Sequence, residues 1–133
     1  VIMSVCCFCL AIENPWSELQ RGPVFGCEAE TGSWLAVAGV PENSDTFDIN
    51  DYDFKFAEYT LHFQENENTQ AQKAMIIKHT SGVSRQEYAI MNDNDIVVSI
   101  GATIEGSTVK LQATPELGIS GVTTYRFIRN TML

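Results

Sequence analysis

The chain has 133 residues, which suits a single domain, and its hydrophobic fraction of 44% is that of an ordinary globular protein. Its formal net charge is −9, from 17 acidic and 8 basic residues, and the basic residues do not cluster. Nucleic-acid binding depends on Lys and Arg side chains that neutralise phosphates, so this charge argues against it. The sequence has no apolar run near the roughly 20 residues that a transmembrane helix needs.

The first ten residues, VIMSVCCFCL, are apolar and contain three of the four cysteines. A secretion signal needs basic residues before its apolar run, but the first basic residue here is Arg21. Structural zinc sites usually separate paired cysteines by about two to four residues, which the C-C-x-C run does not match. We therefore expect a strand over 1–12 whose cysteines are reduced and buried, with cover supplied at least partly by another subunit.

The rest of the chain predicts β-structure almost throughout. Residues 15–32 contain several Pro and Gly residues and are expected to be irregular, with one helical turn at 16–20. An acidic loop is expected over 41–53. Alternation of apolar and polar residues, together with turn residues at the boundaries, predicts strands over 33–40, 46–49, 54–64, 71–80, 83–91, 95–104, 108–114 and 122–132.

One of these strands has an irregular pattern. In 54–64 the alternation changes phase at Ala57–Glu58, which predicts a β-bulge. Short strands separated by turn residues at intervals of about 8–12 positions are typical of two-layered β folds. We therefore predict an all-β protein, an antiparallel β-sandwich of jelly-roll-like type, with an N-terminal extended segment.

Two groups of polar residues contain side chains that can bind metal ions. Asp45, Asp48, Asp51 and Asp53 could offer oxygen ligands to calcium, but their spacing does not match an EF-hand, and Asp is common in turns for local reasons. We expect a solvated loop there. His62 and His79 lie on neighbouring predicted strands and have no third ligand, so we expect surface positions for both.

The sequence contains no pattern that indicates catalysis. It lacks the G-x-S-x-G elbow of serine hydrolases, and its glycine-rich stretch 118–121 lacks the Lys and the following helix of a phosphate-binding loop. We expect a protein that is not an enzyme and has no cofactor, no metal and no catalytic residues. The aromatic side chains are expected mainly in the core: Trp16, Trp34, Phe54, Phe56, Tyr59, Phe63, Tyr88, Tyr125 and Phe127.

From about Phe47 onward, several blocks of sequence follow one another in an order that matches the predicted strands. These blocks are FKFAEY at 54–59, MIIKH at 75–79, Tyr88, VKLQATP at 109–115 and TYRFIR at 124–129. In this order and spacing the chain resembles a module of virion structural proteins from tailed phages, notably phages of marine bacteria and cyanobacteria. That module usually has Arg and Lys at the positions of Lys55 and Glu58, and since Glu58 reverses the second charge, a charge pairing there is not carried over.

The resemblance implies a division of the chain and a role. Residues 46–133 would form the β-sandwich module, and 1–45 an N-terminal strand and irregular attachment segment, within one compact domain. The protein would be a structural subunit of a phage particle, in a capsid decoration, neck or tail fibre, assembled in the bacterial host cytoplasm. It would form a homo-oligomer, most plausibly a trimer, and bind other virion proteins, without contacting nucleic acid or membrane.

The sequence is compatible with two functions of different classes. In the first, the apolar N-terminal segment docks on other virion proteins, by strand addition or insertion into a groove. Its interface residues would be Val1, Ile2, Val5, Phe8 and Leu10, with Trp16 and Trp34 as aromatic anchors. In the alternative, the sandwich is a receptor- or carbohydrate-binding adhesin tip with exposed aromatic residues.

Overall fold

The structure is a computed structural model, and it describes residues 25–49, 55–80 and 82–132. These residues form eight β-strands and no helix. The strands are β1 (Phe25–Leu35), β2 (Glu42–Asp48), β3 (Phe56–Glu65), β4 (Asn68–His79), β5 (Gly82–Asp93), β6 (Val98–Glu105), β7 (Thr108–Pro115) and β8 (Val122–Met132).

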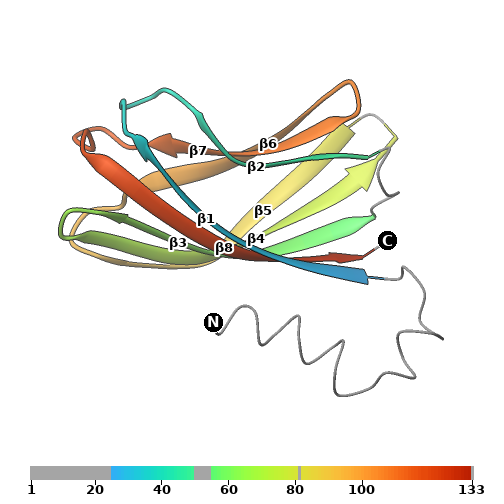
Figure 1. Cartoon of the computed structure of the whole chain (residues 1–133), viewed down its shortest axis with the longest axis horizontal. Coiled ribbons are helices and arrows are strands. Elements are labelled where there is room, and N and C mark those ends of the chain that lie inside the picture. Colours follow the sequence, from blue (N-terminus) through green and yellow to red (C-terminus); the bar gives the residue numbers. More distant parts are fainter. Residues whose placement is uncertain (1–24, 50–54, 81, 133) are drawn as a thin grey trace, which may run out of the picture.

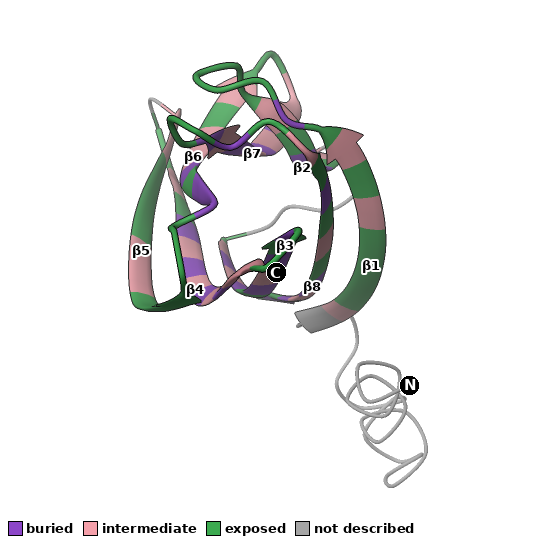
Figure 2. Cartoon of the chain, turned by 90° about the vertical axis from the view of Figure 1, so that its left-hand side faces the viewer, coloured by how far each residue is buried: buried purple, intermediate pink, exposed green. Residues whose placement is uncertain are grey.

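The strands form two antiparallel sheets that face each other. The large sheet has the order β1-β8-β3-β4-β5, and the small sheet has the order β2-β7-β6. Figure 1 shows the small sheet lying across the large one. Figure 2 shows that the large sheet curves, so that β5 and β1 rise toward the small sheet at its two sides. The predicted all-β antiparallel sandwich is confirmed.

Strict alternation of buried and exposed positions places the core between the sheets (Figure 2). In β3 the inward side chains include Tyr59, Leu61 and Phe63, each 1% exposed or less. In β7, Val109, Leu111 and Ala113 have the same orientation and are fully buried. Because side chains of a strand point alternately to opposite faces, the even-numbered positions of β3 lie on the outer face of the large sheet.

The bulge expected at Ala57–Glu58 is wrong. β3 pairs without interruption with β4 on one side and with β8 on the other. Phe56 is an apolar residue on the outer face, and this one residue created the apparent change of phase. The structure has shifts of register elsewhere, between Asn43 and Asp45 in β2 and between Ala71 and Lys73 in β4.

The sandwich begins earlier in the chain than residue 46. Strand β1 pairs with β8 along its whole length and forms one edge of the large sheet. Strand β2 pairs with β7 in the small sheet. Residues 25–45, expected as part of an attachment segment, therefore supply strands to both layers, and the irregular region expected at 15–32 includes most of β1. The expected strand 1–12 and the helical turn at 16–20 lie outside the described residues.

Side chains close the sandwich on the side where β5 and β6 meet. Gln70 in β4 accepts hydrogen bonds at Oε1 from the backbone N–H groups of Val97 (2.8 Å) and Val98 (3.0 Å), and its Nε2 donates to the Val98 carbonyl (3.0 Å). Glu87 in β5 accepts from the N–H of Ile100 at 3.2 Å. These bonds satisfy backbone groups at the start of β6 that a neighbouring strand would otherwise pair.

Candidate functional site

A buried ion pair joins the two sheets. Asp45 of β2 accepts hydrogen bonds at Oδ2 from Arg129 Nη1 of β8 at 2.6 Å and from the Tyr59 hydroxyl of β3 at 2.8 Å. The side chains of Arg129 and Asp45 are 7% and 5% exposed. A charged group removed from water is tolerated only when it is paired, so each residue here depends on the other. Asp45 was expected in a solvated loop, and this is corrected.

Further contacts hold the guanidinium in place. Arg129 Nε donates to Thr131 Oγ1 at 3.1 Å, and the guanidinium carbon lies 4.6 Å from the centre of the Phe47 ring. Burial of Tyr59, followed by the negative charge of Asp45, raises the pKa of its hydroxyl well above 10.0. Tyr59 therefore stays a neutral donor at physiological pH. All of these groups are occupied by one another, which is the pattern of a structural network.

A small polar cavity of about 190 Å³ opens beside this ion pair. It lies where edge strand β1 of the large sheet approaches edge strand β2 of the small sheet. Its lining consists of Glu30, Asn43, Ser44, Asp45, Thr46 and Tyr125. Ser44 is 3% exposed, and its Oγ has no hydrogen-bond partner among the described residues. A buried hydroxyl without a partner is costly, and it marks this cavity as a place for a polar ligand or water.

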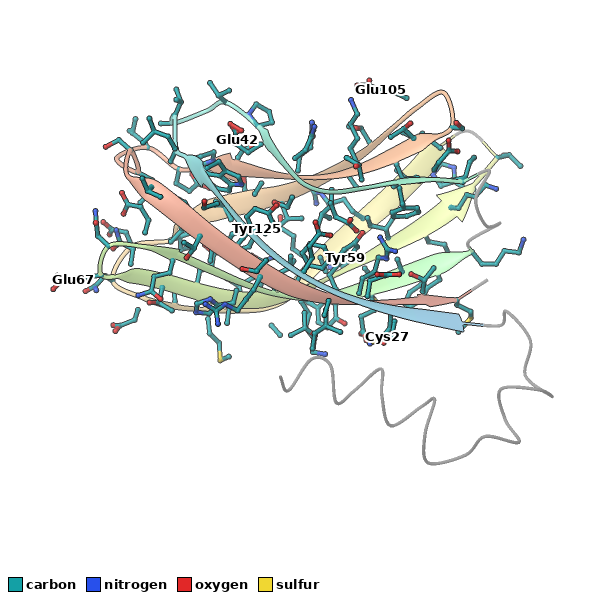
Figure 3. All side chains as sticks on the ribbon, viewed as in Figure 1. Cys27, Glu42, Tyr59, Glu67, Glu105 and Tyr125 are labelled. Carbon is teal, nitrogen blue, oxygen red and sulfur yellow. The ribbon has the colours of Figure 1, made fainter. Side chains whose placement is uncertain are left out.

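Tyr125 forms the aromatic wall of the cavity. Its ring stacks between Trp34, at a centroid distance of 6.3 Å, and Phe127, at 6.4 Å. Figure 3 shows Tyr125 and Tyr59 between the two sheets. Tyr125 also lies over Gly32 of β1, where a Cβ would stand only 2.5 Å from the Tyr125 hydroxyl oxygen. Partial burial, with the charges of Glu30 and Asp45, raises the pKa of Tyr125 above 10.0.

These residues can hold a small neutral polar molecule. The cavity combines carboxylate, amide and hydroxyl groups with an aromatic face, and Asp45 is already neutralised by Arg129. In the described part of the chain, no three His, Cys, Asp or Glu side chains come together as ligands for a metal ion. Asp45 in particular is engaged by Arg129 and Tyr59 rather than directed into a calcium loop.

The predicted interface residues are mostly outside the described part of the chain. This applies to Val1, Ile2, Val5, Phe8, Leu10 and Trp16. Trp34 lies in β1, is partly buried, and packs against the core beside Tyr125. Its Nε1 is buried without a hydrogen-bond partner among the described residues. Trp34 is therefore a wall of the sandwich interior rather than an exposed anchor.

The two histidines do not form a pair. His62 in β3 lies opposite Ala71 of β4, whereas His79 is eight residues further along β4 and lies opposite Gly82 of β5. This separation is about 26 Å along the strand. Partial burial and the nearby charge of Arg126 lower the pKa of His62 below 6.5. A joint metal or titration role for the histidines is therefore excluded by the register.

Sequence reasoning missed the cavity and the ion pair because their members come from distant segments. Asp45 and Arg129 are 84 positions apart, and Ser44 and Tyr125 are nearly as far apart. The sequence contains one signal of the ion pair. Arg129 follows Tyr125 and Phe127 at every second position of β8, so it lies on the inward face, where a charge is tolerated only if it is paired.

Comparisons of sequence with known proteins give no match: neither a protein-family model nor a curated protein is similar to this chain. A solved structure does share the fold. The described sandwich resembles part of the tailspike protein of Acinetobacter baumannii phage AM24, with a TM-score of 0.57 and 8% sequence identity. The match covers 81% of this chain and 26% of the tailspike chain, so the chain spans about a quarter of that protein's length. At this identity the likeness concerns the fold alone.

Among the described residues, the structure has no helix that is long and apolar enough to cross a membrane.

Proposed function

We propose that this chain is a structural component of a phage tail and that it acts without catalysis. The observation that supports the proposal is the fold shared with part of a phage tailspike protein over 81% of the chain. From Phe56 onward, the blocks of sequence that resemble a virion module fall on strands of that shared fold. The chain would reside in the virion.

The polar contacts between the two sheets are consistent with a mechanically stable structural domain. The Asp45–Arg129 pair connects β2 with β8, and Gln70 connects β4 with the start of β6. Each link joins the large sheet to the small one. Polar contacts that are fully satisfied fix one arrangement of the layers, which suits a component that transmits force or holds a defined spacing.

In its finer form the proposal includes self-association and docking on other virion proteins of the capsid, neck or tail. A homotrimer is the assembly we favour, as the resemblance implies. Strands β1 and β2 are edge strands of the two sheets on the same side of the sandwich, and a partner would add a strand there.

The experiment is a measurement of mass and of particle association. The purified full chain is analysed by size-exclusion chromatography with light scattering, and purified phage particles from its source are searched for its peptides by mass spectrometry. We expect an oligomer and a defined copy number per particle. A chain that stays monomeric at all concentrations and is absent from the particles would contradict the proposal.

The cavity favours a second candidate function, the binding of a host-surface carbohydrate or receptor group. Sugars are commonly held by an aromatic face together with amide, carboxylate and hydroxyl partners, and Tyr125, Asn43 and Glu30 supply these groups here. A glycan array tests this candidate. The variants Glu30→Gln and Asn43→Ala, both at exposed positions, should abolish any signal, and Glu105→Gln in β6 serves as the matched control. Equal signals for all variants would exclude the cavity as the site.

A further inference from the structure

An apolar patch lies on the outer face of the large sheet, away from the core. It consists of Phe56 of β3, Met75 and Ile77 of β4, and Met132 of β8, and is called the Phe56 patch below. Ile77 and Met132 are each 54% exposed, and Phe56 and Met75 are half-buried. Register brings Met132, Phe56 and Ile77 into one row across three neighbouring strands. Contiguous apolar groups on an outer sheet face indicate a surface that something covers.

The patch is hollowed on both sides of Phe56. One hollow, of about 260 Å³, is lined by Phe56, Met75, Ile77, Ser84, Arg85 and Gln86. The other, of about 210 Å³, is lined by Phe56, Glu58, Asn130, Thr131 and Met132. Two hollows on either side of one ring fit apolar side chains that alternate along an extended segment.

Cys27 of β1 lies beside this patch on the same face of the sheet. It is opposite Asn130, which is opposite Glu58, which in turn is opposite Met75. Neighbouring strands are about 4.8 Å apart, so the backbone of Cys27 in β1 is about 10 Å from that of Glu58 in β3. Phe56 is two residues from Glu58 along β3. Figure 3 shows Cys27 near the start of β1 at the lower side of the large sheet.

Cys27 is disulfide-bonded, and this corrects the expectation that all the cysteines are reduced. The sequence has only three other cysteines, Cys6, Cys7 and Cys9, so an intrachain disulfide joins Cys27 to the segment VIMSVCCFCL. Because the Cα atoms of a disulfide are usually about 5.5 Å apart, such a bond would bring the bonded part of this segment to the side of the patch. The residues that precede the bonded cysteine would span about 17 Å if it is Cys6 and about 26 Å if it is Cys9, which is enough to reach the Phe56 row from Cys27.

We propose that the apolar segment Val1–Leu10 of the same chain covers the Phe56 patch, with the Cys27 disulfide as its tether. The segment has apolar residues at both odd and even positions, as in Val5 and Phe8. An extended segment of that kind can place one face on the sheet and still offer an apolar face to a partner. This inference is independent of the proposed function, since it concerns contacts within a single chain.

Hydrogen exchange followed by mass spectrometry of the full, oxidised chain tests the docking. We expect the amides of 2–10 to exchange at least about tenfold more slowly than those of an unstructured peptide. Ile77→Glu should remove this protection, because it places a charge within the patch. Leu117→Glu is the matched control: Leu117 is 95% exposed and lies beyond the opposite end of β8, so the protection should remain.

The outcomes separate the possible occupants of the patch. Protection that is present at all protein concentrations and is lost only in Ile77→Glu supports the proposal. Protection that appears only as the protein concentration rises would assign the patch to a second copy and overturn it. Free exchange of 2–10 in the oxidised wild-type chain would also overturn it.

The tether is tested separately by peptide mapping without reduction. We expect a Cys27 peptide cross-linked to the peptide that contains Cys6, Cys7 and Cys9, and Cys27→Ser should increase the exchange of 2–10 severalfold. A Cys27 thiol that reacts with iodoacetamide in the unreduced, folded protein would contradict the proposal. These results leave the fold and the particle association untouched, so they do not decide the proposed function.

Discussion

The Asp45–Arg129 pair permits a sharp test of how the two sheets are held together. The variant Asp45→Leu removes the carboxylate that pairs with the buried guanidinium of Arg129, whose other contacts include Thr131 and the Phe47 ring. An uncompensated buried charge costs about 3–5 kcal/mol, and the Tyr59 hydroxyl loses its acceptor at a further cost of about 1 kcal/mol. We therefore expect the free energy of unfolding to fall by about 4–6 kcal/mol.

The double variant Asp45→Leu/Arg129→Met makes the test specific. Replacement of both members of a buried ion pair by apolar side chains is often nearly neutral, so only the unpaired Tyr59 hydroxyl should remain as a cost, at about 1–2 kcal/mol. The double variant should thus be more stable than Asp45→Leu alone. Glu105→Gln is the control, because the Glu105–Lys110 pair is on the surface and its loss should cost no more than about 1 kcal/mol.

Urea unfolding, followed by tryptophan fluorescence, measures these free energies. Trp34 is partly buried between the sheets, so its emission changes when they separate. If Asp45→Leu is too unstable to fold, the free energy of unfolding of the double variant can still be measured, since the double variant is expected to fold. A cost for Asp45→Leu below about 1 kcal/mol, or a double variant whose cost equals the sum of the two single variants, would refute the reasoning.

Three further predictions concern other contacts. Gly32→Ala should lower the free energy of unfolding by about 1–3 kcal/mol and weaken the near-ultraviolet circular dichroism of the stacked rings, whereas Gly101→Ala, with nothing within 4 Å of its Cβ, should change neither. Gln70→Leu should cost about 2–4 kcal/mol and speed amide exchange at Val98, and unchanged exchange there would argue against the cap on β6. Glu65 accepts hydrogen bonds that lower its pKa below 4.5, so its contribution to stability should be present at neutral pH and decline as the pH falls below about 4.5. The difference in the free energy of unfolding between wild type and Glu65→Gln should therefore shrink in acid. A difference that does not depend on pH would contradict this.

The strands from 56 to 132 could be predicted from the sequence because local signals agreed there. Alternation in β3 and β7 matches the burial seen in the structure, and turn residues mark most of the boundaries. Strands β3 and β7 each have one apolar face that must be covered. Local pattern and tertiary packing therefore favour the same conformation.

The same reasoning failed for most of β1 because its inward positions before Trp34 include residues that are not apolar. Glu30 faces the polar cavity and Gly32 lies beneath the Tyr125 ring, and neither residue type favours a strand by itself. Strand β8 and the packing of Tyr125 stabilise β1 at these positions. Such a strand is specified by its neighbours and not by its own sequence.

The candidate site was out of reach for a related reason. The buried state of Asp45 depends on Arg129, and the inward position of Gln70 depends on the backbone of β6. Polar residues at inward positions look like surface residues until their partners are known. Which polar side chains find hydrogen-bond partners in the interior depends on how the two sheets pack, and the local sequence pattern does not contain this information.

The hydrogen bonds that Gln70 and Glu87 make with the start of β6 distinguish the two sides of the sandwich. These bonds occupy backbone groups at the start of β6, whereas β1 and β2 are the edge strands on the opposite side of the sandwich. A building block that is adhesive on one side forms small closed assemblies of fixed size, while one that is adhesive on two opposite sides grows into open-ended fibres. By occupying backbone groups at the start of β6, Gln70 shortens the part of that edge to which a further strand can add.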